Sequence, residues 1–386
     1  MKKRILFYCQ PVLGIGHYIR SREIVRALSA FDVCFVNGGE IVAGLEMPVC
    51  VEVVNLPALK SDADFQTLHT SEPHYSLDEI KAQRKQQLAE IYDRFDPDAV
   101  IIELFPFGRR KFDFELIPLL EKIRTSSATK IVCSLRDILV SKRNQAQFET
   151  EACDLMNRYF DLLLIHSDPN FQRLEETFPR VSDITCEVRY TGFVAQATEP
   201  NSRPAMLRDP AAPIEIIVSI GGGRVGKELI DCAIAAAQLL PQNLSYRMRI
   251  VTGPHFPDED FLSLQTRLTA NPDFSVERFT PNFPAYLRRA DLSISMAGYN
   301  TCMDILSAGV RAIVFPFTGN NNQEQTMRAE KLEKVGAVKV IHQLKAENLA
   351  SLITQSLSAP PTNLKFNLDM QGAEATAKII SEITQA

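Results

Sequence analysis

The sequence predicts an α/β fold in two domains, each built on a parallel sheet. Short apolar runs alternate with longer amphipathic runs, which favours repeated strand–helix–strand units. The alternation stops at residues 196–213, a polar stretch with four prolines, and then begins again. The 386 residues also exceed what one compact core usually holds. We therefore expect two Rossmann-like domains whose sheets face each other across a cleft.

The first domain is expected over residues 1–195. Its strands are predicted at 4–9, 32–37, 49–55, 99–102, 130–134, 161–166 and 187–191. Helices are predicted at 18–29, 77–95 and 148–160. The helix at 77–95 has a clear start, because Ser76 and Glu79 have the spacing of a capping box.

The second domain is expected over residues 214–366, after a linker at 196–213. Its strands are predicted at 214–219, 246–252, 274–279, 292–295, 312–315 and 338–341. Helices are predicted at 227–240, 284–289, 301–308, 322–334 and 346–358. One more helical pattern lies within residues 367–386, and we expect that helix to cross back to the first domain.

Composition and charge narrow the functional classes. The net charge of −5 gives no reason to expect a nucleic-acid partner. No apolar run approaches the ~20 residues that span a bilayer, and the apolar start of the chain is too short for a signal peptide. The eight cysteines include no C-x-x-C pair. We expect a cytoplasmic protein without disulfides.

A glycine pair follows the first predicted strand. Gly14 and Gly16 let the backbone turn tightly, and His17 then stands at the carboxyl end of the strand. An imidazole there can accept a proton at neutral pH; the alternative is a histidine that only caps the next helix. The spacing is not a dinucleotide fingerprint, because Ile19 occupies the position of the third glycine.

Two clusters in the second domain suit a nucleotide. Amides of the loop Gly221, Gly222 and Gly223, with the charge of Arg224, can bind a phosphate; a tight turn that packs strand against helix is the alternative. The second cluster follows the strand at 292–295 and consists of Gly298, Tyr299, Asn300, Thr301 and Asp304. There the amides can face a second phosphate edge and Asp304 can accept from ribose hydroxyls, or Thr301 and Asp304 can form a capping box.

A third cluster suits a sugar. Residues 316–325 form a polar, amide-rich turn after a strand and include Gln323 and Glu324. Amides donate and accept while a carboxylate accepts, which matches the hydroxyls of a sugar. The alternative is an asparagine N-cap with a solvated first turn.

Together these clusters resemble the two-domain glycosyltransferases of the GT-B fold, nearest to the bacterial MurG-type N-acetylglucosaminyltransferases. The similarity covers most of the chain and is densest over residues 214–337. By this resemblance Asp304 replaces a ribose-binding glutamate, and Gln323 and Glu324 replace two glutamines that face the donor sugar. Thr280 and Phe283 belong to the segment whose backbone contacts uracil. The match looks closer to a less characterised group of bacterial glycosyltransferases than to the peptidoglycan enzyme.

The resemblance implies transfer of a sugar from a nucleotide diphosphate to a hydroxyl or amine. It implies a UDP-linked donor such as UDP-N-acetylglucosamine, inversion at the anomeric carbon, and neither a bound metal nor another cofactor. His17 is then the base, and Gln196 stands where an arginine is expected. Three alternatives share the fold: a nucleotide-sugar hydrolase, a UDP-sugar 2-epimerase, and a sugar-nucleotide-binding protein without catalysis. The acceptor, a small molecule, lipid or glycan, is not identified by the sequence.

Other candidates lie on the acceptor side. Glu103 ends a strand and is an alternative base, and Asp137 follows another strand end. The long polar segment 57–75 is expected to touch the acceptor. The basic run 109–111 is interpreted as a solvated turn, with peripheral membrane contact as the alternative. The D-x-D triplets at 62–64, 96–98 and 258–260 are interpreted as solvated turns in polar loops rather than metal sites.

Overall fold

The chain folds into two compact units. A computed structural model describes residues 2–12, 15–42, 44–61, 67–70, 74–126, 128–196, 212–319, 323–359 and 367–385. One unit consists of Met1–Ala195 together with Leu368–Ala386, and the other of Gln196–Asn367. Each unit is described by itself below.

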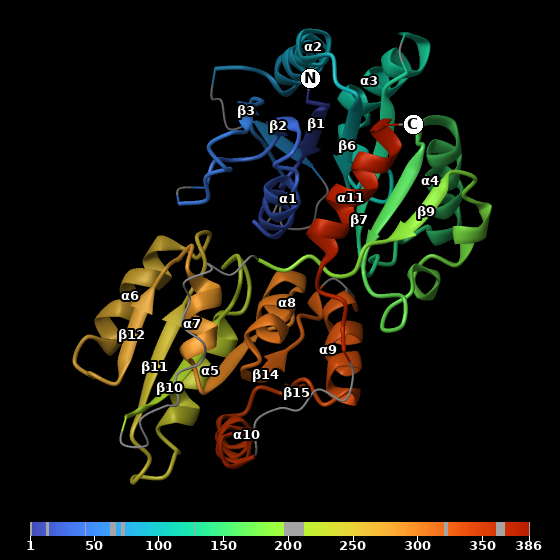
Figure 1. The fold of residues 1–386 in the computed structure, drawn as a ribbon. Helices are drawn as coiled ribbons and strands as arrows, with labels where there is room; N and C mark the ends of the chain where they lie inside the picture. Colours follow the sequence, from blue (N-terminus) through green and yellow to red (C-terminus); the bar gives the residue numbers. More distant parts are fainter. Residues whose placement is uncertain are drawn as a thin grey trace. The chain divides into compact units, whose positions relative to one another are not determined.

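The first unit contains a parallel seven-stranded sheet with the order β3-β2-β1-β6-β7-β8-β9 (Figure 1). Its strands are β1 (Arg4–Cys9), β2 (Asp32–Asn37), β3 (Glu52–Asn55), β6 (Ala99–Glu103), β7 (Lys130–Arg136), β8 (Leu162–His166) and β9 (Glu187–Tyr190). A separate antiparallel hairpin joins β4 (Leu59–Ser61) to β5 (Leu68–Thr70). In parallel register Tyr8 lies opposite Ile102, and Glu103 opposite Ser134, so the carboxyl ends of β1, β6 and β7 share one edge.

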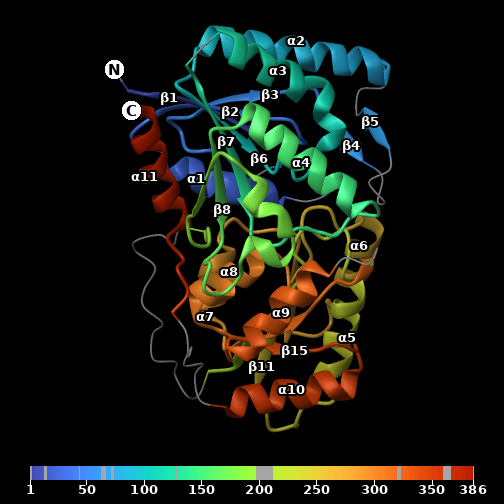
Figure 2. The same ribbon diagram turned by 90° about the vertical axis from the view of Figure 1, so that its right-hand side faces the viewer.

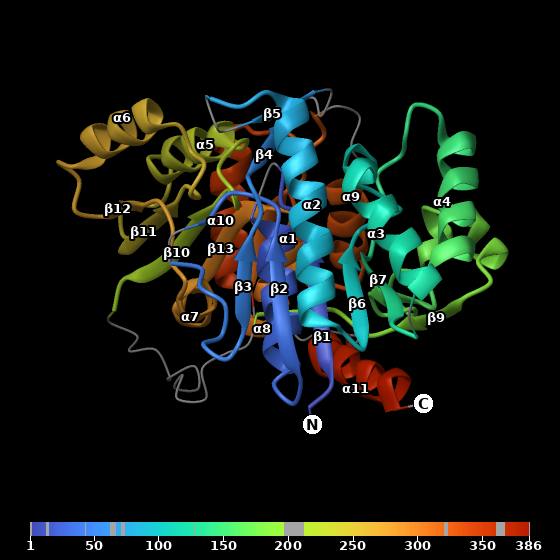
Figure 3. The same ribbon diagram turned by 90° about the horizontal axis from the view of Figure 1, so that it is seen from above.

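Helices cover both faces of this sheet because alternate residues of each strand point to opposite sides. Ile5, Phe7 and Cys9 of β1 pack with α1 (Gly16–Ala27) and α11 (Gly372–Gln385). Leu6 and Tyr8 belong to the core on the other face, which is covered by α2 (Leu77–Phe95), α3 (Asp113–Ser126) and α4 (Gln145–Tyr159). Figures 2 and 3 show α2 and α3 side by side on that face. Short 3₁₀ turns lie at η1 (Arg110–Phe112), η2 (Leu174–Glu176) and η3 (Pro179–Asp183).

The C-terminal helix is part of the first unit. The amide of Phe193 donates to the carbonyl of Asp369 (2.7 Å), and the amide of Gly372 donates to the carbonyl of Phe193 (3.0 Å). The amide of Asp369 also donates to the Asp168 carboxylate (3.1 Å). Helix α11 then packs beside α1, as Figure 1 shows in red and blue.

The second unit contains a parallel six-stranded sheet with the order β12-β11-β10-β13-β14-β15. Its strands are β10 (Ile214–Ser219), β11 (Tyr246–Val251), β12 (Phe274–Glu277), β13 (Leu292–Met296), β14 (Arg311–Phe315) and β15 (Lys339–Val340). Its helices are α5 (Lys227–Ala237), α6 (Asp258–Leu268), α7 (Phe283–Arg289), α8 (Tyr299–Ala308), α9 (Glu324–Lys334) and α10 (Ala346–Ser358). Helices α5, α6 and α10 share a core with alternate residues of β10.

The predicted α/β class and the two parallel sheets are confirmed, and every predicted strand has a counterpart in the structure. The predicted capping box at Ser76 and Glu79 is also present. Helices α3 and α6 and the β4–β5 hairpin were not predicted. Because Asp258 and Asp260 lie in the first turn of α6, the interpretation of that D-x-D triplet as a polar loop is wrong.

A buried ion pair ties α2 and α3 to the sheet. Arg84 and Glu115 are both almost fully buried and join through two hydrogen bonds of 2.6 and 2.8 Å. Arg84 also donates to the carbonyls of Gly38 (2.9 Å) and Pro57 (2.7 Å), and Tyr8 donates to Glu115 (2.5 Å). One guanidinium therefore anchors the segments that follow β2 and β3.

We predict that Arg84→Met lowers the free energy of unfolding by about 3–5 kcal/mol, because it leaves the Glu115 charge buried without its partner. Chemical denaturation measures this loss. The matched control is Arg94→Ala, which removes an exposed pair with Glu52 and should cost far less, because solvent screens the two charges. Equal losses in the two variants would contradict the anchoring role.

Candidate active site

His17 and Glu103 form a close pair in the first unit. His17 lies in the first turn of α1, and Glu103 is the last residue of β6. The Nδ1 atom of His17 lies 2.7 Å from Oε1 of Glu103, which is fully buried. Arg20, three residues further along α1, donates to the same carboxylate oxygen. Helix α1 has no side-chain cap from the described residues, so the alternative in which His17 caps it is wrong.

The Glu103 carboxylate sets the tautomer of His17. Burial alone would raise the pKa of Glu103, but His17, Arg20 and Arg109 outweigh it and hold that pKa below its usual range. An ionised carboxylate only accepts hydrogen bonds, so Nδ1 must carry the proton and Nε2 keeps its lone pair. Burial lowers the pKa of His17 to about 4, with Arg109 and Arg20 acting in the same direction and Glu103 against them. His17 is therefore neutral at pH 7.

The turn after Glu103 has two strained positions. Leu104 and Arg109 have φ values of 68° and 62°, in the left-handed region that non-glycine residues seldom occupy. Arg109 is partly buried, and its Nε atom has no hydrogen-bond partner among the described residues. Thus the solvated-turn interpretation of residues 109–111 is wrong at Arg109. Lys111 alone of the three is exposed.

A second buried histidine supports the same sheet edge. His166, at the end of β8, lies 2.7 Å from the hydroxyl of Ser134 and 2.9 Å from that of Thr191. Burial, and after it the charge of Arg20, lower its pKa to about 3. His166 is fully buried and joins three neighbouring segments, so we assign it a structural role.

The glycine loop at residues 221–223 of the second unit can expose backbone amides, and it also lets two backbone segments pack closely. A Cβ added at Gly223 would lie 2.6 Å from the Thr252 carbonyl oxygen, and one at Gly253 2.3 Å from the Gly221 carbonyl oxygen. The loops after β10 and β11 thus touch through their backbones, and His255 donates to the Gly222 carbonyl (3.0 Å). A Cβ at Gly221 would meet no atom of the described residues within 4 Å, so this glycine is needed only for its φ of 65°.

The N-terminus of α8 has a glycine as its N-cap. The helix begins at Tyr299 with Gly298 as N-cap, and no side chain among the described residues caps it. The capping-box alternative for Thr301 and Asp304 is therefore wrong. A Cβ at Gly298 would meet no described atom within 4 Å, so the first amides of α8 have space beside them. A helix N-terminus of this kind attracts anions through its exposed N–H groups and its dipole.

Asp304 is buried one turn further along α8, with 3% of its surface exposed. Its carboxylate accepts a hydrogen bond of 2.7 Å from the side-chain amide of Gln196. Asn300 and Thr301 are partly exposed, and Tyr299 is buried under the guanidinium of Arg328 (5.5 Å from the ring centre).

The two predicted sugar-binding residues at the start of α9 differ in their exposure to solvent. Gln323 is the exposed N-cap of the helix. Glu324 is buried and accepts from Arg328 (2.9 Å), which is fully buried and also donates to the Ala297 carbonyl (3.2 Å). Sequence reasoning missed Arg328 and Arg20. Their i,i+4 spacing from Glu324 and i,i+3 spacing from His17 were the available signals.

The remaining predicted residues lie as follows. Thr280 is buried, and its hydroxyl accepts a hydrogen bond from the Asn282 amide (3.1 Å). Phe283 is the first residue of α7 and is partly exposed. Arg224 is exposed. Asp137 is fully buried and its carboxylate accepts from the Ile138 amide (2.9 Å). Gly16 is the first residue of α1. Gly14 and residues 62–66 and 71–73 of the segment 57–75 lie outside the described residues.

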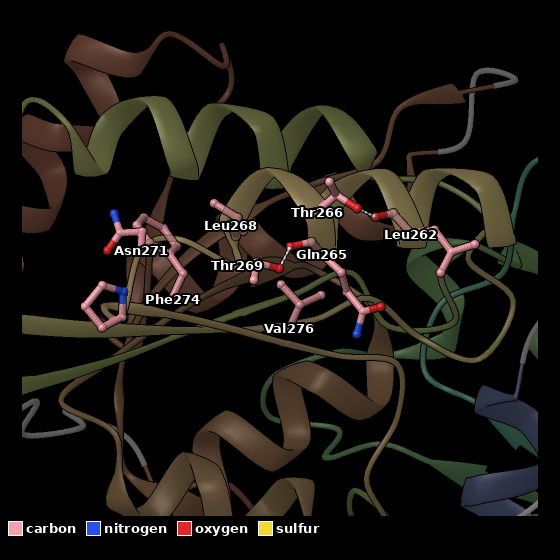
Figure 4. A pocket seen from close by; sticks show the side chains of 9 residues that line it. Leu262, Gln265, Thr266, Leu268, Thr269, Asn271, Phe274 and Val276 are labelled. Carbon is pink, nitrogen blue, oxygen red and sulfur yellow. Dashed lines mark hydrogen bonds between the residues drawn. The ribbon is translucent and has the colours of Figure 1, made fainter.

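A pocket in the second unit lies apart from these residues. It is lined by α6 and β12 and the turn between them, including Leu262, Gln265 and Asn271 (Figure 4). The hydroxyls of Thr266 and Thr269 donate to carbonyls of their own helix (2.9 and 2.7 Å). Its lining has no charged side chain among the described residues and shares none with the predicted donor site.

Within the described ranges, no group of three or more His, Cys, Asp or Glu side chains is placed to hold a metal ion. No helix among those residues is both long enough and apolar enough to cross a bilayer.

Comparison with known proteins confirms the predicted resemblance and the GT-B fold. Residues 216–383 match the model of the glycosyltransferase family 28 C-terminal domain. The chain is 29% identical over 161 residues to a UDP-N-acetylglucosamine–N-acetylmuramyl-(pentapeptide) pyrophosphoryl-undecaprenol N-acetylglucosamine transferase of Methylobacterium radiotolerans, covering 41% of this chain and 42% of that protein. The transferase of the same name from Hahella chejuensis is 28% identical over 185 residues, 47% and 48% of the two chains. The chain thus matches less than half the length of these relatives.

Solved structures extend the likeness of the fold to both units. MurG of Acinetobacter baumannii has a TM-score of 0.56 at 16% identity and covers 100% of both chains. The glycotransferase of kitacinnamycin has a TM-score of 0.60 at 14% identity, covering 100% of this chain and 95% of that one. The UDP-GlcNAc 2-epimerase of Methanocaldococcus jannaschii has a TM-score of 0.61 at 11% identity, covering 99% and 100%. At these identities the likeness concerns the fold.

His17, which is partly buried, and His166, which is fully buried, should make the protein less stable as the pH falls from 6.5 to 4.5. The unfolded chain takes up a proton at each of them near pH 6.5, whereas the folded protein does so only near pH 4 at His17 and pH 3 at His166. The unfolded state therefore binds more protons, and each histidine lowers the free energy of unfolding by up to about 1.4 kcal/mol per pH unit. Denaturation curves at several pH values measure this slope.

His17→Asn should make the free energy of unfolding depend less steeply on pH, because the contribution of one of the two histidines is removed. The exposed His342→Asn serves as the matched control for replacing a histidine. A slope in His17→Asn as steep as in the unmodified protein would contradict the assignment of a neutral His17 with a lowered pKa.

Proposed function

We propose that this protein transfers a sugar from a UDP-linked donor, with UDP-N-acetylglucosamine as the first candidate, to a hydroxyl or amine of an acceptor. The observation that carries the proposal is the N-terminus of α8, with a glycine as N-cap and Asp304 buried one turn further along, within the region that matches the family 28 domain. The first unit would bind the acceptor and the second the donor. The relatives named above use the same chemistry according to their names.

In the donor site, the first amides of α8 and the loop at Gly221 would stabilise the diphosphate. Asp304, positioned by Gln196, would accept from the ribose hydroxyls. Gln323 would face the sugar, with Glu324 fixed by Arg328, while the backbone at Thr280 and Phe283 would contact the base. Backbone dipoles supply the positive potential here, so the proposal includes no metal.

In the acceptor site, Nε2 of His17 would take the proton of the attacking group. The oxygen or nitrogen of the acceptor would form a bond to the anomeric carbon as the bond from that carbon to the diphosphate oxygen breaks. A single displacement of this kind inverts the configuration. Glu103 then stabilises the imidazolium that forms, which makes it a positioning residue rather than the alternative base. We place the protein in the cytoplasm, with peripheral membrane contact where the acceptor is a lipid.

His17→Ala should lower turnover by about 10²–10⁴-fold while UDP affinity stays within a factor of two or so, because the base acts only on the acceptor. UDP release from UDP-N-acetylglucosamine, followed with and without candidate acceptors, measures turnover. Free sugar without acceptor would identify a hydrolase, and N-acetylmannosamine an epimerase. Near-normal turnover in the variant would refute the base assignment.

Asp304→Ala should weaken UDP binding by about 1–3 kcal/mol, because the ribose hydroxyls would lose their hydrogen-bond acceptor. Isothermal titration calorimetry with UDP measures the change. Ser307→Ala, at an exposed position of the same helix, is the matched control. Unchanged affinity in a folded Asp304→Ala protein would remove the ribose assignment.

A further inference from the structure

The pocket of the second unit lies between helix α6 and the edge strand β12 (Figure 4). Strand β12 is the last in the order of its sheet, and among the described strands it pairs only with β11. An edge strand presents backbone N–H and C=O groups that no other strand of its sheet takes up. The pocket has a volume of about 500 Å³ and is lined by residues of both elements, so it adjoins this edge.

The hydrogen bonds between β11 and β12 show which residues of β12 face outward. The carbonyl of Asp273 accepts from the Met248 amide (2.7 Å), and the carbonyl of Glu277 accepts from the Thr252 amide (3.0 Å). Along a parallel strand, residues that bond to one neighbouring strand alternate with residues that point to the other side. Val276 therefore directs its N–H and C=O groups away from β11, toward the free edge.

The side of α6 that lines the pocket faces away from α5. Arg267 pairs with Asp231 of α5 (2.7 Å), which turns its side of the helix toward α5. Leu262, Gln265 and Thr266 lie on the other side of α6 and line the pocket. Figure 4 shows the pocket between these side chains of the helix and those of β12. The pocket therefore lies at the outer edge of the sheet, beside the outward-facing groups of the strand.

The lining suits an apolar side chain. Leu262 is 61% exposed, and Phe274 and Val276 are partly exposed. The hydroxyls of Thr266 and Thr269 already donate to carbonyls of their own helix. No charged side chain among the described residues lines the pocket. A ligand therefore finds apolar surface in the pocket and backbone hydrogen-bonding groups at its rim.

Acidic residues lie at both ends of the groove between α6 and β12. The ion pair of Asp258 with Arg278 joins the start of α6 to the end of β12, so Glu259 lies at that end. Asp273 precedes the first residue of β12 and lies at the other end. Glu259 and Asp273 are both exposed, and neither has an ion pair within the described ranges. Their negative charges favour a basic partner.

We propose that the groove between α6 and β12 binds an extended segment of a partner protein, which adds a strand to β12. The backbone of the segment would pair with the N–H and C=O groups of Val276, and an apolar side chain would enter the pocket. Lysine or arginine side chains on either side of that apolar residue would meet Glu259 and Asp273. The groove shares no residue with the predicted donor site, so this binding is a function separate from sugar transfer.

The probe that tests this proposal is a phage-displayed library of short linear peptides, selected on the full chain. We expect the selected peptides to share an apolar residue flanked by lysine or arginine. A saturating amount of one such peptide should slow hydrogen exchange at the Val276 amide about tenfold or more, as measured by NMR. No enriched peptide, acidic flanks, or an unchanged exchange rate at Val276 would overturn the proposal.

Variants in the groove locate the binding. Leu262→Lys should weaken binding of the selected peptide about tenfold or more, because it places a positive charge in the path of a basic segment. Leu262 is exposed, so this variant should fold. The matched control is Leu239→Lys, which changes a leucine that is 52% exposed just after α5 and should leave binding unchanged. Fluorescence anisotropy with the labelled peptide measures each affinity, and equal losses in the two variants would overturn the proposal.

A charge exchange tests the basic flanks of the segment. Glu259→Arg should weaken binding of the selected peptide, and replacing the flanking lysines of the peptide with glutamate should restore it in this variant. Unchanged binding in Glu259→Arg would contradict the recognition of a basic segment.

A second copy of this chain is the competing occupant of the groove. We expect light scattering to give the same molar mass for the unmodified protein and for Leu262→Lys in the absence of peptide. A dimer that Leu262→Lys dissociates would assign the groove to self-association and overturn the proposal of a foreign partner.

Discussion

The buried carboxylate of Glu103 is the constraint on which the candidate active site depends. A charge removed from water costs several kcal/mol unless close partners compensate for it. Arg20 and His17 provide that compensation from adjacent turns of α1. The ion pair therefore fixes where α1 begins relative to the end of β6, and it orients the imidazole so that Nε2 has no hydrogen-bond partner among the described residues. Stability and reactivity of this site have the same physical origin.

The candidate sites of the two units differ in the source of their positive electrostatic potential. In the first unit, cationic side chains surround one acid, and the site is positive because of formal charges. In the second, the predicted donor residues include the glycine loop at 221–223 and the N-terminus of α8, where backbone N–H dipoles can attract an anion. Backbone sites are rigid and cannot be neutralised by loss of a proton, which suits a leaving diphosphate. Side-chain sites can change protonation, which suits a base.

Hydrophobic periodicity and the positions of glycines predicted most of the fold. Contacts between residues far apart in the sequence could not be predicted. Strand β1 and helix α2 follow from local patterns, and their predicted bounds agree with the structure. Helix α6 was missed because its first turn, Asp258 to Asp260, looks like an acidic loop until Arg278 and Lys227 pair with it. The contact between His17 and Glu103 spans 86 residues, so no local spacing could reveal it. For the same reason Arg109 looked solvated in the sequence.

Two positions at which the sequence was expected to differ from the resembled family, 196 and 304, are in contact in the structure. Aspartate is one methylene shorter than glutamate, and in the structure its carboxylate is met by Gln196 rather than by an arginine. A glutamine amide donates a hydrogen bond without adding a positive charge, so it orients the acid and leaves its charge available to other donors. An arginine there would form an ion pair and compete with ribose hydroxyls for the same oxygens. Gln196 and Asp304 thus form one hydrogen-bonded pair, in which the amide orients the carboxylate.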